Sequence, residues 1–206
     1  GGAGTTATDI SGQGNHGTLT NGPVRAIGKL GQALDFDGSN DTVAVPQSSS
    51  LNNLSTITIS AWIYGRSFPG GTPPRIVDKL NANNDGGFIL YMNGISPSFH
   101  AGRWITANGE WESTTATVST NVWTHVLATY DYASAANDPV IYINGSSVSI
   151  TETATPSGSL ASETEILNIG NRDDLTRTFN GLIDDVRVYN RALNADEIKR
   201  LYNLGR

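Results

Sequence analysis

The clearest binding chemistry in the sequence surrounds an Asn-Gly dipeptide at residues 108–109, which has a tryptophan on each side. Asn-Gly between two strand-like runs favours a two-residue hairpin turn. Such a turn pairs Thr106 with Trp111. Because side chains alternate along a strand, Trp104 then becomes a diagonal neighbour of Trp111 on the same face, ~7–8 Å away at Cα. The pattern predicts a surface with two indoles.

The same alternation predicts which residues surround these tryptophans. His100 shares their face, and Tyr91 turns away from the core because Leu90 and Met92 occupy the core side of its strand. Two exposed indoles beside polar groups can bind a sugar, since the C–H faces of a pyranose pack on indole while its hydroxyls need hydrogen-bond partners. We therefore expect a ligand site made of Trp104, Trp111, His100, Tyr91 and Arg103.

This interpretation depends on the strand register. Arg103 lies on the opposite face unless Gly102 forms a bulge, and a register slip at that bulge would turn both tryptophans inward. One residue of slip inverts every side chain of a strand, so the exposure of Trp104 and Trp111 stays open at this point. Exposed tryptophans favour a binding surface, whereas buried ones favour a structural domain.

Catalytic chemistry has weaker support. Glu110 and Glu112 put two carboxylates on one strand face, and glycoside hydrolysis requires such a pair. They follow a turn, however, and lack the extended Glu-x-Asp-x-x-Glu pattern of strand-borne hydrolase sites, so two solvated glutamates are the better interpretation. The sequence has no Gly-x-Ser-x-Gly motif, and its 3 histidines lie in unrelated segments. We expect no enzymatic activity.

Short strands would position these residues. Runs of β-branched and aromatic residues predict strands over residues 56–63, 98–107 and 182–189, among others, and Asn-Gly dipeptides recur between such runs. Only the C-terminal residues predict a helix, because Asn194 and Glu197 form a capping-box pattern before an apolar stripe. The expected fold is all-β, a two-sheet antiparallel jelly-roll sandwich with a short C-terminal helix.

Composition agrees with one domain of this kind over residues 1–206. The chain is 37% apolar and contains 23 glycines and 8 prolines, as many short strands joined by tight turns require. Cysteine is absent, which excludes disulfides. The net charge of −6 argues against a nucleic-acid partner. No apolar run approaches the ~20 residues that would insert into a membrane.

Six segments carry a resemblance that spans nearly the whole chain. They are an opening loop, several strands, a strand followed by an Asn-Gly turn, and a final strand with an acidic pair and a capped helix: residues 9–17, 31–38, 58–63, 122–131, 140–145 and 179–202. Together they resemble laminin-G-like (concanavalin A-like) jelly-roll domains of the bacterial type. The resemblance implies a monomeric module of a larger secreted or cell-surface protein, which agrees with the Gly-Gly-Ala-Gly start of the chain.

The resemblance also implies a structural calcium ion at the edge of the sandwich. It would place the ligands at Asp184, at Asp37 and in the loop of Asp9, which supply the hard oxygens that calcium prefers. Asp9 and Asp37 also fit ordinary turns in which a carboxylate accepts local backbone N–H bonds. Asp185 is better explained by a salt bridge to Arg187 or Arg191.

Two classes of function follow. The first is a non-catalytic carbohydrate-binding module that recognises a polysaccharide through exposed aromatic residues. The second is a structural or adhesive module of a large surface, phage or matrix protein, without a glycan site. The exposure of Trp104 and Trp111 discriminates between them.

Overall fold

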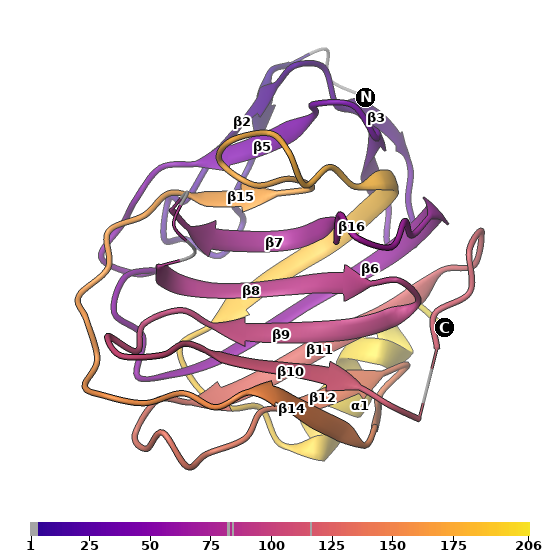
Figure 1. Cartoon of the computed structure of the whole chain (residues 1–206). Coiled ribbons are helices and arrows are strands. Elements are labelled where there is room, and N and C mark those ends of the chain that lie inside the picture. Colours follow the sequence, from indigo (N-terminus) through magenta and orange to yellow (C-terminus); the bar gives the residue numbers. More distant parts are fainter. Residues whose placement is uncertain (1–3, 82, 84, 116) are drawn as a thin grey trace.

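The computed structural model describes residues 4–81, 83, 85–115 and 117–206. Within these residues the strands form two antiparallel sheets packed face to face, one of nine strands and one of seven (Figure 1). We call the first the front sheet and the second the back sheet. The two-sheet jelly-roll sandwich predicted from the sequence is confirmed.

The front sheet contains, in spatial order, β1 (Thr6–Ala7), β2 (Gly17–Thr20), β5 (Thr42–Val45), β15 (Leu167–Ile169), β7 (Arg75–Leu80), β8 (Gly86–Asn93), β9 (Ser96–Ala101), β10 (Gly109–Ser113) and β14 (Ile150–Ala154). The back sheet contains β13 (Ser146–Ser147), β12 (Val140–Ile143), β11 (Thr124–Asp131), β6 (Thr56–Ser67), β16 (Asn180–Tyr189), β4 (Gln32–Asp37) and β3 (Val24–Ile27). Successive strands such as β5, β6 and β7 lie in the front, back and front sheets, so the chain crosses between the sheets repeatedly.

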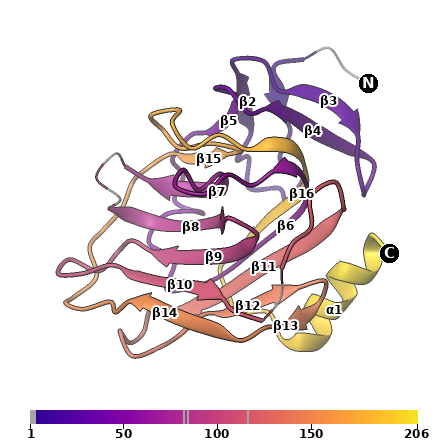
Figure 2. The ribbon, with the colours of Figure 1, turned by 45° about the vertical axis from the view of Figure 1, so that its right-hand side comes forward.

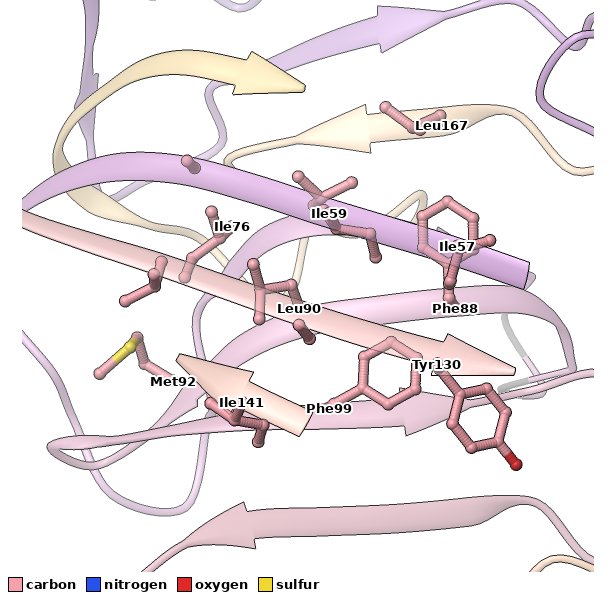
Figure 3. Close-up of a cluster of buried hydrophobic side chains, with 14 of the residues drawn as sticks. Ile57, Ile59, Ile76, Phe88, Leu90, Met92, Phe99, Tyr130, Ile141 and Leu167 are labelled. Atoms are coloured by element: carbon pink, nitrogen blue, oxygen red, sulfur yellow. The ribbon is translucent and has the colours of Figure 1, made fainter. Parts of the chain in front are cut away.

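The core fills the space between the two sheets (Figure 3). It follows the alternation of the strands: Leu90 and Met92 of β8 point inward, as does Phe99 of β9, and Ile59 of β6 meets them from the back sheet. Burying each such side chain contributes roughly 1.5–3 kcal/mol to folding, so the core fixes which face of every front-sheet strand is left for the surface.

The C-terminal helix α1 (Ala195–Leu204) covers part of the outer face of the back sheet (Figure 2). The predicted capping box is present: the Asn194 side chain accepts from the Glu197 N–H, and the Glu197 carboxylate accepts from the Asn194 N–H, each at 3.0 Å. Ile198 is fully buried and packs with Leu127 of β11 and with Leu193. Capping and one apolar stripe therefore dock the helix.

Three Asn-Gly dipeptides, at 93–94, 108–109 and 144–145, predicted hairpins. The hairpin after β8 is present, with its turn at Gly94 and Ile95 because Asn93 pairs with Ser96. Asn144 and Gly145 both adopt positive φ (51° and 74°) and connect Ile143 to Ser146, as a two-residue turn requires. The dipeptide at 108–109 forms no such turn, and its consequence for the site is given below. In the described part of the chain, no helix has the length and apolar character needed to cross a membrane.

Candidate functional site

The two tryptophans of the predicted platform lie in the core, so that prediction is wrong. Trp111 is 0% exposed and Trp104 is 7% exposed. The Trp111 ring packs against Tyr130 at a centroid distance of 5.3 Å, and its indole N–H donates to Asp138 Oδ1 at 2.8 Å. The Trp104 indole N–H donates to the Tyr130 hydroxyl at 3.2 Å. Neither ring can stack on a sugar.

The physical reason is the register of the hairpin. β9 ends at Ala101, and residues 102–108 form a loop in place of the expected two-residue turn. Gly109 is already the first residue of β10 and pairs with Ala101, so Trp111 pairs with Phe99 rather than with Thr106. Since Phe99 faces the core, Trp111 faces it too.

Arg103 is 8% exposed and lies away from His100 and Tyr91, at a separate cleft of about 290 Å³ that Trp104 also lines. Its guanidinium donates to the carbonyl oxygens of Ala161 (3.1 Å) and Leu54 (2.8 Å), and it lies over the Tyr132 ring at 5.2 Å. These contacts tie the 102–108 loop to two distant segments. We therefore assign Arg103 a structural position, in contrast to its predicted place beside the ligand.

His100 and Tyr91 do come together, on the outer face of the front sheet. Both line a cleft of about 410 Å³ across strands β7 to β10 and β14. This outer-face cleft is lined by Pro73, Arg75, Ile89, Tyr91, Asn93, His100, Glu110, Glu112, Thr153 and Arg177. Strand pairing explains the gathering: His100 pairs with Ile89 on one side and Glu110 on the other, so the three side chains leave the same face.

Hydrogen bonds hold the floor of this cleft. The Tyr91 hydroxyl donates to Glu110 Oε1 at 2.5 Å, and His100 Nδ1 lies 4.0 Å from the same oxygen. Asn93 Nδ2 donates to Glu112 Oε2 at 3.0 Å. Burial, and secondly the bond to Glu110, raise the pKa of Tyr91, so the phenol stays a proton donor. The carboxylates keep acceptor capacity toward the open side of the cleft.

Arg75 of β7 lines the cleft on the side opposite to Glu110 and Glu112. Arg75 lies over the Tyr91 ring at 4.8 Å, and its Nε is 3.1 Å from Asp78 Oδ2. Asp78 is fully buried; burial raises its pKa to about 6, while Arg75 acts in the opposite direction. Burial also lowers the pKa of Arg75, which Asp78 partly offsets. The pair places a guanidinium at the cleft with little freedom to move.

The carboxylates predicted to bind calcium are occupied by backbone donors. Asp184 accepts from the Leu30 and Asp185 N–H groups, each at 2.7 Å, one on each carboxylate oxygen. Asp37 accepts from the Ser39 N–H at 2.7 Å. The Asp9 carboxylate accepts from the Ser11 N–H and from the Asn15 N–H, each at 2.9 Å, and the Ser11 bond is the largest cause of its lowered pKa.

These three aspartates also lie apart. Asp37 of β4 pairs with Asn180 of β16. Asp184 lies four residues after Asn180 on β16, which at the rise of a strand is ~13 Å from it. Among the described residues, no group of three or more His, Cys, Asp or Glu side chains could hold a metal ion. The three predicted ligands therefore do not fit one calcium ion. The predicted salt bridge of Asp185 is present, with Arg187 at 2.9 Å.

The comparisons with known proteins identify the family of the chain. A family model described as the concanavalin A-like lectin/glucanases superfamily matches residues 37–199, and the chain belongs to this family. This confirms the laminin-G-like resemblance drawn from the sequence. A comparison with curated proteins gives no significant match.

Solved structures support the same fold at low sequence identity. Domain 4 of AbnA, an extracellular arabinanase from Geobacillus stearothermophilus in complex with arabinotriose, is similar with a TM-score of 0.67 and 19% identity, covering 95% of this chain and 92% of that one. The binding domain of Paraclostridial Mosquitocidal Protein 1 is similar with a TM-score of 0.75 and 18% identity. The match covers 95% of this chain and 49% of that one. Botulinum neurotoxin type C, whose cell entry depends on interaction with two ganglioside molecules, is similar with a TM-score of 0.65 and 15% identity. The match covers 97% of this chain and 48% of that one. The chain thus spans about half the length of the toxin structures.

Sequence reasoning found part of the cleft and missed the rest. The sequence places Glu110 and Glu112 on one strand face, but the interpretation there is of two solvated glutamates rather than of ligand-binding groups. That observation already implied that Trp111, which lies between them, faces the other way. Arg75 and Arg177 gave no local signal, because their proximity comes from strand order rather than from spacing along the chain.

Proposed function

We propose that this domain is a non-catalytic module that binds a polysaccharide or another glycan in the outer-face cleft. The observation that carries the proposal is the cleft itself, an open depression whose floor combines carboxylate, amide, imidazole and guanidinium groups. Sugars present many hydroxyls, each both donor and acceptor, and need this kind of mixed polar surface.

The mode of binding differs from the aromatic platform expected from the sequence. Tyr91 contributes its hydroxyl and only the edge of its ring, because it is 5% exposed and Arg75 lies over its face. Recognition would come from hydrogen bonds of Glu110, Glu112 and Asn93 to sugar hydroxyls. The cleft is open and shallow rather than enclosed, so useful affinity needs several sugar residues of a polymer.

The fold comparison supports a glycan ligand by analogy. The arabinanase domain in complex with arabinotriose matches this chain over 92% of its own length, so the two are comparable as whole domains. That arabinanase is extracellular, and we propose the same location here. At 19% identity the analogy concerns the class of ligand and not the sugar.

A second candidate is a structural or adhesive module without a glycan site. The burial of Trp104 and Trp111 favours it, because it removes the exposed indoles on which the sequence argument for sugar binding depended. In that case the polar groups of the cleft would be ordinary solvated side chains on the outer face of the sheet. The two candidates differ in one measurable property, which is retention by a soluble polysaccharide.

Affinity electrophoresis in gels containing single polysaccharides tests the proposal. We expect at least one polymer to retard the domain. Glu112→Ala should weaken this retention at least tenfold, because the loss of a charged hydrogen bond costs ~1.5–3 kcal/mol. Asp196→Ala removes the same charge from an exposed position on α1, on the other side of the sandwich, and should leave retention unchanged. No retardation by any polymer, or equal retention of Glu112→Ala, contradicts the proposal.

A further inference from the structure

The outer-face cleft carries opposite charges at its two ends. Glu110 and Glu112 lie on β10, whereas Arg75 lies on β7, three strands away. Three inter-strand spacings separate the two backbones by ~14 Å. The side chains lie closer, because the Arg75 guanidinium lies over the Tyr91 ring and the Tyr91 hydroxyl donates to Glu110. Arg177 lines the same cleft from the segment between β15 and β16. A ligand that spans the cleft therefore meets arginines at one end and carboxylates at the other.

The arginine end is held in place by the backbone. The Arg75 N–H donates to the carbonyl oxygen of Arg177 at 3.0 Å, which fixes the two residues side by side. The Arg177 N–H donates to Asn171 Oδ1 at 3.1 Å, and the fully buried Asn171 donates in turn to the Asp41 carbonyl at 3.2 Å. The segment that carries Arg177 is thus tied to the body of the sandwich.

The guanidinium groups at this end repel one another, since Arg177 and Arg172 both disfavour the charge of Arg75. Asp78 pairs with Arg75, and Asp174 lies 3.5 Å from Arg172, which is close enough to act on Arg75. Among the described residues, Arg177 makes no ion pair, and its Nε is shielded from solvent without a hydrogen-bond partner. Asp174 acts on both Arg172 and Arg177, and Arg177 in turn acts on Arg75. An anion placed between Arg75 and Arg177 would relieve their repulsion.

We propose that the glycan bound in this cleft is acidic and that its anionic group, a carboxylate or a sulfate, lies between Arg75 and Arg177. This inference rests on the proposed function and names the class of ligand. The planar guanidinium fork binds such oxyanions through paired hydrogen bonds. Neutral sugar residues then extend toward Glu110 and Glu112, which accept bonds from their hydroxyls.

The acidic end adds a condition on the ligand. A polymer charged on every residue would bring a second anionic group next to the two glutamates, which like-charge repulsion disfavours. A sparsely substituted polymer avoids this contact. We therefore expect glucuronoxylan to retard the domain more strongly than polygalacturonate does.

Matched polymers in affinity gels test the inference. Glucuronoxylan is compared with unsubstituted xylan for a carboxylate ligand, and a sparsely sulfated dextran with dextran for a sulfate ligand. We expect the anionic member of one pair to retard the domain at least tenfold more than its neutral counterpart. Added salt should reduce the retardation, since charge carries it.

The variant Arg177→Gln isolates the arginine end. Arg75→Gln is unsuitable alone because it would leave the buried Asp78 without its partner. Arg177→Gln should lower retention by the anionic polymer at least tenfold, and Arg177→Lys should restore only part of it. Arg200→Gln removes an equal charge from the exposed face of α1 and should change nothing.

The outcomes separate the two claims. Retention by neutral polymers alone, or equal retention of Arg177→Gln and the unaltered domain, overturns the acidic-ligand inference and leaves the proposed function intact. No retention by any polymer overturns both. Retention that Arg177→Gln and Arg200→Gln lower equally would show a nonspecific charge effect and also overturns the inference.

Discussion

The outer faces of the two sheets differ in what covers them. On the back sheet, Leu127 faces outward and is fully buried because Ile198 and Leu193 pack over it. On the front sheet, the outward residues of β10 are Glu110, with 41% of its side chain exposed, and Glu112. The outward side chains thus form a second apolar cluster on the back sheet and a polar cleft on the front sheet.

This difference shows why one face is available for ligands. Helix α1 buries part of the outer face of the back sheet. The outward positions of that sheet are therefore occupied by apolar and aromatic side chains such as Trp62 and Tyr142. No described helix lies over the front sheet, so its outward positions can carry charge (Figure 2). The cleft therefore lies where the fold leaves polar groups accessible.

The largest expected effect concerns the inner side of β10. Trp111→Ala should lower the free energy of unfolding by about 3–5 kcal/mol, because it empties a fully buried site and removes the bond to Asp138. Glu112→Gln, one residue away on the outer side, should change it by less than ~0.5 kcal/mol. Urea unfolding of both variants measures the contrast. Equal destabilisation would mean that the two sides of β10 do not differ as described.

A second effect, dependent on pH, belongs to the covered face of the back sheet. His125 is 1% exposed, and its ring centroid lies 5.2 Å from Trp62 beneath α1. Burial, and secondly the charge of Arg187, lower its pKa to about 4. Because the unfolded value is near 6.5, the stability from neutral His125 is present above pH 6.5 and is lost as pH falls toward 4.

Comparison with His125→Gln isolates this contribution. Between pH 7 and pH 4, the unaltered domain should lose up to about 3 kcal/mol more unfolding free energy than the variant. Asp78, with its raised pKa of about 6, has the opposite dependence, since its stability is lost as pH rises from about 4 through 6. It contributes equally to both proteins, so it cancels in the difference. Parallel pH curves would show that His125 is not buried in its neutral form.

A smaller effect tests the attachment of the helix. Asn194→Ala removes the acceptor for the Glu197 N–H and should cost about 1 kcal/mol. Thermal unfolding measures it, with Asn203→Ala near the C-terminal end of α1 as the matched control. An unchanged melting temperature would mean that the cap does not help to hold the helix over the back sheet.

The smallest expected effect concerns calcium. A single ion shared by Asp9, Asp37 and Asp184 would make chelator lower the melting temperature by several degrees, by mass action. The hydrogen bonds of these carboxylates predict no such change. Asp184→Ala should destabilise the domain with and without chelator, because the Leu30 and Asp185 N–H groups lose their acceptor. A fall in the melting temperature with chelator alone would restore the calcium site.

Local sequence signals predicted the elements that local chemistry determines. The strand over Val140–Ile143, the Asn-Gly turn after it and the capping box at Asn194 are all present. Each depends on residues within a few positions of one another. The short strands β1, β2 and β3 were missed, because their runs are brief and their pairing with β2, β5 and β4 respectively supplies much of their order.

The failure at residues 108–109 has a long-range cause. Trp104 pairs with Leu160 and Ala107 pairs with Ser157, so the loop is fixed by a segment about 50 residues later in the chain. These contacts override the local preference of Asn-Gly for a two-residue turn. The arginine end of the cleft was out of reach for the same reason, since Arg75 and Arg177 meet only through the order of the strands.

The central claim is that the outer face of the front sheet is the binding face. An NMR titration tests it directly. Backbone amide chemical shifts are recorded while oligosaccharides of the polymer that retards the domain in affinity gels are added. The account predicts shifts clustered on β8, β9 and β10 and at Arg177, with none on β11, β12 or α1. Shifts confined to α1 and the back sheet would contradict it.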